Sequence, residues 1–287
     1  MIALLTSILI DGIAYGMILF MISVGFTVTL GLMRVVNLAH GLFAMLGGYL
    51  VALLVSRYSF PYMAAFIAAI LGVSLAGVVL ERAVIRWIYG KPELDQVLLT
   101  IGLTFIGIAS AGLLFGNSLV SVPLPSMLQG ATDLGFRMIP TQRLAAVLIG
   151  CVAIAVIWFI MERTNFGIQL RATVDNTLAA QAIGIETAKV YAIAFAIGAA
   201  LAGIGGIVGA QLLPIEPNYA LKYLVLFLAV VAVGGLGSVW GSLVAAIILG
   251  IIETGGKYVM PDLASIGLYA AMLAILTWRP NGLFGKH

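Results

Sequence analysis

The sequence predicts an all-α, polytopic membrane protein with eight or nine transmembrane helices, allowing for one or two that are broken. Hydrophobic residues make up 63% of the chain and charged residues 9%, whereas charged residues make up roughly 25% of a soluble domain. The mean hydropathy is +1.19, and apolar runs close to the roughly 20 residues that a spanning helix needs recur along the chain. We therefore treat residues 1–287 as a single transmembrane domain.

The apolar runs define the expected spans in order. No basic residue and no cleavage site accompanies the first run, so we expect it to be retained rather than removed as a signal peptide. The seventh and eighth runs are short and joined by a Gly-Gly-Leu-Gly-Ser-Val turn, so the alternative is one broken or re-entrant element and eight spans. The nine runs are Ile2–Leu30, Leu38–Val55, Pro61–Leu80, Val97–Phe115, Leu144–Met161, Val190–Leu213, Tyr223–Gly235, Trp240–Ile252 and Leu263–Trp278.

Basic residues between these runs predict the orientation, because cytoplasmic loops carry an excess of Lys and Arg. A cytoplasmic 162–189 loop places nine basic residues inside, namely Arg34, Arg82, Arg86, Lys91, Arg163, Arg171, Lys189, Arg279 and Lys286. Five then lie outside, namely Arg57, Arg137, Arg143, Lys222 and Lys257. We therefore expect an external N-terminus, a cytoplasmic C-terminus and a long external loop at Gly116–Gln142.

Polar side chains interrupt the apolar sequence between the first two spans, where Arg34, Asn37 and His40 precede Gly41. Polar groups at a helix break in lipid are costly unless they face protein or a wet cavity. Asn37, His40 and Gly41 are therefore candidates for the border of a translocation path. The alternative is structural: Arg34 snorkels to the headgroups, Asn37 caps the next helix, and His40 is satisfied in its first turn.

The loop 162–189 holds six charged residues and is the longest charge-bearing interruption of the chain. Within it, Thr173–Ile185 has the features of a short helix with N-cap residues, a glycine stop and a narrow apolar stripe. The cap candidates are Asp175 and Asn176, the stop is Gly184, and the stripe is Val174, Leu178 and Ala182. Such an element can lie in a groove of another protein. Alternatively, it rests on lipid headgroups as an interfacial helix.

The sequence disfavours an enzyme and gives no catalytic residue, metal site or cofactor site. No GxxxxGK[ST] phosphate-binding loop occurs, so ATP binding is not expected on this chain. HExxH and Gly-x-Ser-x-Gly motifs are also missing. Cys151 is the single cysteine, which excludes a disulfide within the chain and a cysteine metal cluster. The basic residues sit between apolar runs and set orientation, so we expect membrane lipid and no nucleic acid as a partner.

Four motifs in order resemble one family. They are Val36-Asn-Leu-Ala-His-Gly41 with Met45-Leu-Gly-Gly-Tyr49, the loop from Arg171 to Ile185, the Gly234-Gly-Leu-Gly-Ser238 turn, and Arg279-Pro-Asn-Gly-Leu-Phe-Gly285. Together, from about Ile10 onward, they resemble the LivH-type permeases of bacterial branched-chain amino acid ABC transporters. The chain departs from the family pattern at Leu42, where relatives have an acidic residue, and at Asp175-Asn176, which replaces Glu-Asn or Glu-Asp.

The resemblance implies a multi-pass permease of the bacterial inner (plasma) membrane that takes part in amino-acid transport. It implies a LivM-type second permease, two cytoplasmic ATPase subunits that use the ATP, and a periplasmic substrate-binding protein. It also implies that Ala172–Gly184 is a coupling helix contacting the ATPase through Arg171, Val174, Asp175, Leu178, Ala179, Ala182 and Gly184. Related permeases serve urea, short amides and aromatic acids, which stay open as substrates. A self-contained secondary transporter and a membrane-embedded enzyme or assembly factor are the other function classes.

Overall fold

The computed structural model describes all residues except Met1, Arg34, Leu134, residues 136–137 and residues 286–287. Three basic residues counted above, Arg34, Arg137 and Lys286, lie outside the described residues. Within the described part of the chain, eight helices are long and apolar enough to cross a membrane. They are α1 (Ile2–Phe26), α2 (Gly41–Ser56), α3 (Tyr62–Ala83), α4 (Glu93–Phe115), α5 (Thr141–Arg163), α8 (Thr187–Gly209), α11 (Val239–Val259) and α12 (Ala264–Trp278).

Shorter elements connect these helices. The π-helix η1 (Thr27–Leu32) prolongs α1, and the 3₁₀-helices are η2 (Leu38–His40), η3 (Ile85–Ile88), η4 (Ser126–Leu128) and η5 (Pro261–Leu263). The other short helices are α6 (Asn165–Asp175), α7 (Thr177–Ala182), α9 (Tyr219–Lys222) and α10 (Leu224–Gly234). Strands β1 (Ala131–Asp133) and β2 (Met138–Pro140) form an antiparallel hairpin in which Thr132 faces Ile139. The all-α prediction is therefore confirmed, apart from this small hairpin.

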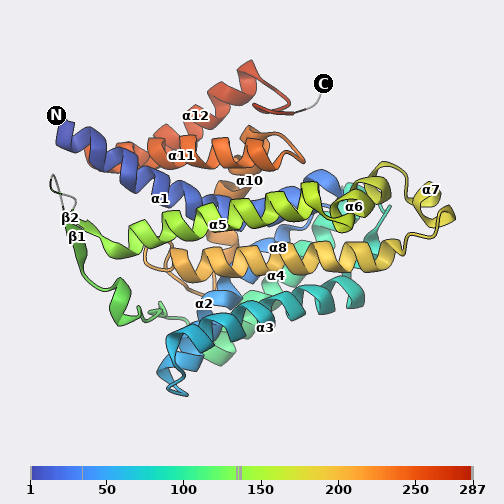
Figure 1. Cartoon of the computed structure of the whole chain (residues 1–287), viewed down its shortest axis with the longest axis horizontal. Helices are drawn as coiled ribbons and strands as arrows, with labels where there is room; N and C mark the ends of the chain where they lie inside the picture. Colours follow the sequence, from blue (N-terminus) through green and yellow to red (C-terminus); the bar gives the residue numbers. More distant parts are fainter. Residues whose placement is uncertain (1, 34, 134, 136–137, 286–287) are drawn as a thin grey trace.

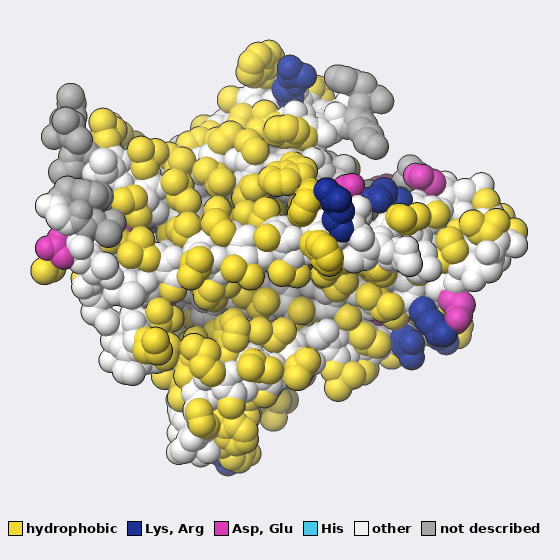
Figure 2. All heavy atoms as spheres, in the orientation of Figure 1, with side chains coloured by type: hydrophobic (Ala, Val, Ile, Leu, Met, Phe, Trp, Pro, Cys, Tyr) yellow, Lys and Arg dark blue, Asp and Glu magenta, His cyan; other side chains and the backbone are white. Residues whose placement is uncertain are grey.

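The bundle is built around α1, whose apolar window is 89% buried. It packs against α5, α8, α10 and α11, while α2 and α3 pack against α8 and α12 packs against α11. By contrast, only 17% of the α4 window and 11% of the α12 window is buried. Side chains on α4 and α12 that are apolar and exposed suit contact with lipid, since hydrocarbon does not penalise them. Yellow side chains accordingly cover much of the face seen in Figure 2.

The predicted seventh and eighth spans need correction. The run Trp240–Ile252 belongs to the full-length helix α11, which continues through Glu253 and Lys257. These two residues pair at 2.9 Å, one turn apart. The run Tyr223–Gly235 contains only α10, with 11 residues. The segment between α8 and α10, which includes the short helix α9, is buried at Ile215 and Tyr219. The structure thus has eight long helices and one half-length helix.

The C-terminal segment is anchored to the end of α10. The amide of Leu283 donates to the carbonyl of Val233 at 2.8 Å, and the amide of Phe284 donates to the carbonyl of Gly234 at 3.1 Å. These bonds satisfy carbonyls in the last turn of a helix, which have no partner within the helix. The resemblance motif Arg279–Gly285 therefore has a structural role as a strap on the Gly234–Ser238 turn.

The two predicted loops lie at opposite ends of the molecule. Figure 1 shows the β1–β2 hairpin beside the start of α1, at the left, and α6 and α7 at the far right. The helices run along the long axis between these ends. This arrangement is what the predicted topology requires of an external Gly116–Gln142 loop and a cytoplasmic 162–189 loop.

Candidate functional site

The predicted helix break between the first two spans is present. The helix of α1 and η1 ends at Leu32, and regular structure resumes with η2 and α2. Side chains of α4 satisfy the irregular backbone between them: the amide of Val36 donates to Gln96 Oε1 at 2.8 Å, and Thr100 Oγ1 donates to the carbonyl of Val36 at 3.3 Å. Because buried backbone groups cannot remain unpaired, these contacts allow the break to exist inside the helical bundle.

His40 ends η2 and is buried in the bundle, 1% exposed. Its Nε2 lies 3.0 Å from the carbonyl oxygen of Ile22 on α1. Since a carbonyl only accepts, Nε2 carries the proton, and in the neutral ring Nδ1 is an acceptor. Nδ1 has no partner among the described residues. The ring stands edge-on to Phe26, at 5.3 Å between centroids, and to Phe43, at 5.7 Å.

Asn37 is completely buried just before η2, and its side chain does not cap that helix. Neither Oδ1 nor Nδ2 has a hydrogen-bond partner in the described part of the chain. The structural alternative for Asn37 is therefore wrong, since the expected capping bond is not made. A buried polar group without a partner costs about 1–3 kcal/mol, so this amide is held at a cost to stability.

Gly41 starts α2 with ordinary helical dihedrals, φ −59° and ψ −21°. A Cβ at this position would lie 3.0 Å from Ala220 Cα and 3.1 Å from the Ala220 carbonyl oxygen. Glycine is needed here for close approach of α2 to α9, and not for a turn. Asn37, His40 and Gly41 are all sealed from solvent, so a solute could reach them only after the surrounding helices move.

The predicted cap and stop of the 162–189 loop are confirmed. Asn176 is the N-cap of α7, and its Oδ1 accepts from the amide of Ala179 at 2.9 Å. Gly184 follows α7 with φ +88°, a left-handed conformation that glycine adopts without strain. The segment from Asn176 to Gly184 is therefore a small helix with defined ends.

Two details of the predicted helix are wrong. It begins at Thr177 and not at Thr173, because Asn176 adopts an extended backbone, φ −154°, that separates α7 from α6. Asp175 consequently ends α6 and is not a cap. The expected stripe is divided: Val174 is half-buried against the core, whereas Leu178 and Ala182 are exposed on α7.

The exposed side of α7 is apolar. Leu178 is 79% exposed and Ile183 is 77% exposed, beside the exposed Ala179 and Ala182. We call these four residues the α7 tip, which projects beyond the helical bundle in Figure 1. Sequence reasoning missed Ile183; the signal for it was an apolar residue directly before the helix-ending Gly184. Large apolar side chains gathered at a projecting end are typical of a protein contact.

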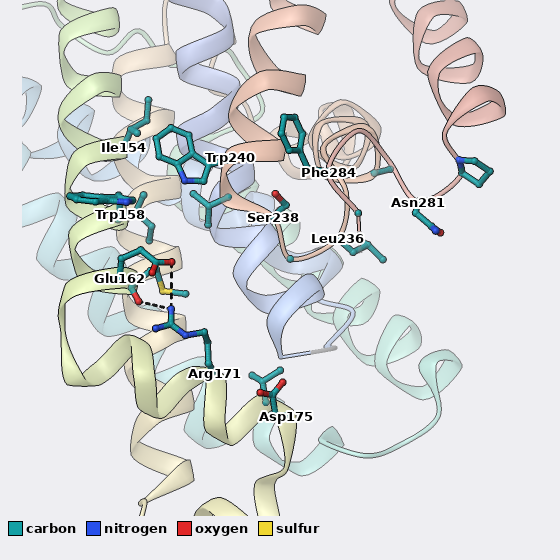
Figure 3. Close-up of a pocket in the computed structure, with 18 of the residues that line it drawn as sticks. Ile154, Trp158, Glu162, Arg171, Asp175, Leu236, Ser238, Trp240, Asn281 and Phe284 are labelled. Carbon is teal, nitrogen blue, oxygen red and sulfur yellow. Dashed lines mark hydrogen bonds and ion pairs between the residues drawn. The ribbon is translucent and has the colours of Figure 1, made fainter. Parts of the chain in front are cut away.

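Arg171 braces α6 against α5. Its Nη1 donates to the carbonyl of Met161 at 2.7 Å and lies 3.6 Å from Glu162 Oε1. Arg171, Val174 and Asp175 line one side of a cavity of about 890 Å³, and the turn after α10 and the C-terminal strap line the other. Figure 3 shows Arg171 directed at Glu162 in this cavity, with Asp175 farther along α6. Arg171 and Asp175 thus lie at the base of the α7 tip and outside it.

Comparison with known proteins matches the chain to one family. The model of the branched-chain amino acid transport system / permease component family matches residues 8–276. The chain is 25% identical to the high-affinity branched-chain amino acid transport system permease protein BraD of Pseudomonas aeruginosa, over 97% of this chain and 95% of BraD. It is 26% identical to the corresponding protein LivH of Salmonella typhimurium, over 96% of this chain and 94% of LivH. It is also 25% identical to LivM of Escherichia coli, over 96% of this chain and 69% of LivM. No solved structure matches the chain significantly.

Proposed function

The chain belongs to the branched-chain amino acid transport system / permease component family, and on that premise we propose that it carries branched-chain amino acids into the cell. The LivH-type resemblance is confirmed, and the chain is a multi-pass permease of the bacterial inner-membrane type. Its relatives are named as transport permeases. In the proposed system ATP is hydrolysed on separate subunits, and this chain holds no cofactor.

The proposed assembly contains a second permease of the LivM type, two cytoplasmic ATPase subunits and an external binding protein. The similarity of this one chain to relatives named LivH and to relatives named LivM supports a pair of related permeases. Urea, short amides and aromatic acids remain alternative substrates, and uptake assays with each solute distinguish them.

A self-contained secondary transporter is less well supported. Such carriers use intramembrane carboxylates as proton or sodium sites. Here Asp11 forms an ion pair with Arg143 and accepts a hydrogen bond from the Tyr258 hydroxyl at 2.6 Å. Glu253 is paired with Lys257 at 2.9 Å. Asp11 and Glu253 thus already have cations within the chain, and the remaining buried carboxylate of the described residues, Glu81, lies in the last turn of α3. This favours a transporter that takes its energy from another subunit.

The α7 tip is the proposed contact with an ATPase subunit, and residues 162–189 are the proposed coupling loop. The observation that carries this assignment is the exposure of Leu178 and Ile183 on a short helix with a confirmed cap and stop. A rigid apolar helix can pack in a groove of the ATPase subunit and transmit its conformational change to the transmembrane helices, which a flexible polar loop does less well. Arg171 and Val174 fix the base of the α7 tip to α5 and to the core.

The helix break between η1 and η2 is proposed to border the translocation path. Asn37 and His40 hold unpaired polar atoms in the bundle interior, and these atoms would bind a zwitterionic solute in a conformation that opens the break. Gly41 allows α2 to lie against α9 there. Weak binding is sufficient, because the delivering protein selects the solute.

The coupling assignment is tested with Ala179→Glu, which places a charge on the α7 tip, and Gly184→Val, which strains the left-handed stop. Both variants are expected to enter the membrane normally and to lose leucine uptake and co-purification of the ATPase subunits. Matched controls are Ala83→Glu, at another exposed alanine, and Gly130→Val, at a left-handed glycine with open space around it at the other end of the molecule. Wild-type uptake and ATPase recovery with both α7 variants would reject the coupling role.

A further inference from the structure

A second cavity, of about 920 Å³, opens at the same end of the molecule as α7. Its walls come from the end of α3, the loop that contains η3, the start of α4 and the α7–α8 segment, and Met33 and Val35 of the helix break complete them. The charged side chains lining it are Glu81, Arg82, Arg86, Lys91, Glu93 and Lys189. The cavity therefore combines an excess of positive charge with carboxylates.

Most of the cations are not neutralised within the chain. Lys189 pairs with Glu186 at 2.7 Å, but Arg82, Arg86 and Lys91 form no ion pair with any residue that the structure describes. Arg86 lies over the ring of Trp87, 4.7 Å from its centroid, and Trp87 is 66% exposed. Guanidinium groups held in this way suit phosphate oxygens, and an exposed tryptophan suits the membrane–water interface.

Glu81 supplies the opposite charge. It is 2% exposed, and its Oε1 accepts from the Tyr89 hydroxyl at 2.9 Å. Burial and the nearby Glu81 carboxylate raise the pKa of Tyr89 above its ordinary value, so the hydroxyl keeps its proton and donates. The other oxygen, Oε2, has no partner in the described part of the chain. A buried carboxylate oxygen left in this state is costly, and an ammonium group in the cavity would offset that cost.

The cavity borders the surface that meets lipid hydrocarbon. Leu94 and Leu98 are 67% and 62% exposed on α4, one and five residues after the cavity residue Glu93. Leu75 and Val79 are 64% and 57% exposed on α3, six and two residues before Glu81. A ligand with a charged head and apolar tails could therefore place its head in the cavity while its tails remain in the membrane.

We propose that this cavity binds the headgroup of a phospholipid that carries both a phosphate and a primary ammonium, as phosphatidylethanolamine does. The phosphate lies at Arg82 and Arg86, and the ammonium donates hydrogen bonds to Glu81. Basic hollows at the cytoplasmic ends of membrane helices commonly receive lipid phosphates, and Glu81 adds selectivity for the ammonium. Thr177 and Gln181 of α7 also line the cavity, so the bound lipid would support α7 from behind.

The test measures lipid binding to the purified full-length chain by native mass spectrometry, and it is independent of transport. The probes are phosphatidylethanolamine, phosphatidylcholine and phosphatidylglycerol with identical acyl chains. The wild-type chain is expected to prefer phosphatidylethanolamine, since a quaternary ammonium donates no hydrogen bond and glycerol carries no charge. Glu81→Gln should weaken phosphatidylethanolamine binding about tenfold, the size expected for a charged hydrogen bond, and should leave phosphatidylglycerol binding intact. Arg82→Gln with Arg86→Gln should weaken all three.

Two further variants separate the site from general effects on folding. Tyr89→Phe frees Oε1 but keeps the Glu81 carboxylate, so it should retain the preference for phosphatidylethanolamine. Glu253→Gln neutralises another buried carboxylate that already has Lys257 as its partner, and it should bind all three lipids as the wild type does. Equal phosphatidylethanolamine binding by wild type and Glu81→Gln, or a wild-type preference for phosphatidylglycerol, would overturn the proposal. Displacement of the lipid by millimolar leucine would overturn it too, by assigning the cavity to a free amino acid.

Discussion

The helix break around Asn37 and His40 differs from the α7 tip in the kind of side chain that departs from the usual burial pattern. At the break, polar side chains are buried, with Asn37 0% and His40 1% exposed. At the α7 tip, apolar side chains are exposed, with Leu178 79% and Ile183 77% exposed. Buried polar groups and exposed apolar groups are the informative exceptions to burial rules. The first exception underlies the proposed translocation path, and the second underlies the proposed contact with an ATPase subunit.

The largest effect on folding is expected from Gly41→Val at the break. The new side chain would meet the backbone of Ala220 at about 3 Å, and overpacking of this kind costs about 1–3 kcal/mol. Thermal unfolding of the purified chain should shift to lower temperature by several degrees. Gly184→Val is the comparison at the α7 tip: the new side chain meets no neighbour but strains the left-handed stop, so the loss of stability should be smaller and confined to α7. Equal melting of both variants would remove the distinction between the two regions.

The next effect has the opposite sign. Asn37→Leu replaces a buried amide without partners by an apolar group of similar size, and it should stabilise the chain by about 1–2 kcal/mol. The same variant should lose leucine uptake if the amide serves the solute. Melting and uptake measured on one preparation check both parts. A variant that transports normally would show that the amide has no role in transport.

A smaller effect on stability is expected at the α7 tip. Leu178→Glu changes a side chain that is 79% exposed, so the free energy of unfolding should move by no more than about 0.5 kcal/mol. Uptake should nevertheless fall strongly, because a charge replaces an apolar contact. Leu119→Glu, at a leucine that is 63% exposed in the loop after α4, provides the control for the stability measurement. A folding defect in Leu178→Glu alone would indicate that α7 belongs to the core of the fold.

The smallest effect is expected from Glu162→Gln. The pair with Arg171 is 3.6 Å long and solvent-exposed, and such pairs contribute between zero and about 1 kcal/mol. Arg171 keeps its bond to the Met161 carbonyl, so the base of α7 stays in place. Melting, uptake and ATPase recovery should all match the wild type. A clear loss of ATPase recovery would extend the contact surface from the α7 tip to the base.

The ends of α7 were predictable from the sequence. The cap at Asn176 and the stop at Gly184 follow from residue preferences that act within a few positions, and the structure confirms both. The stripe with Val174 was not predictable by the same reasoning, because it assumed one continuous helix. The extended backbone of Asn176 divides that helix, and spacing in the sequence no longer gives a common face.

Long-range contacts account for what the sequence left open. The position of the break was visible from Asn37 and His40, but the bond from His40 to Ile22 and the missing cap at Asn37 depend on how α1 and α2 meet. Likewise, the predicted run Trp240–Ile252 stops before Glu253, whereas Glu253 is 7% exposed inside α11. Its pairing with Lys257 lets the helix continue past both charges, which apolar run length alone cannot anticipate.

The strap at Leu283 and Phe284 has a consequence for biosynthesis. Its partners, the carbonyls of Val233 and Gly234, are synthesised about 50 residues earlier. The two hydrogen bonds at the end of α10 therefore cannot form until the strap has left the ribosome. Until then the half-length helix lacks two of its terminal hydrogen bonds. Insertion of α11 and α12 must therefore precede the final fixing of α10, which makes the middle of the bundle one of the last parts to mature.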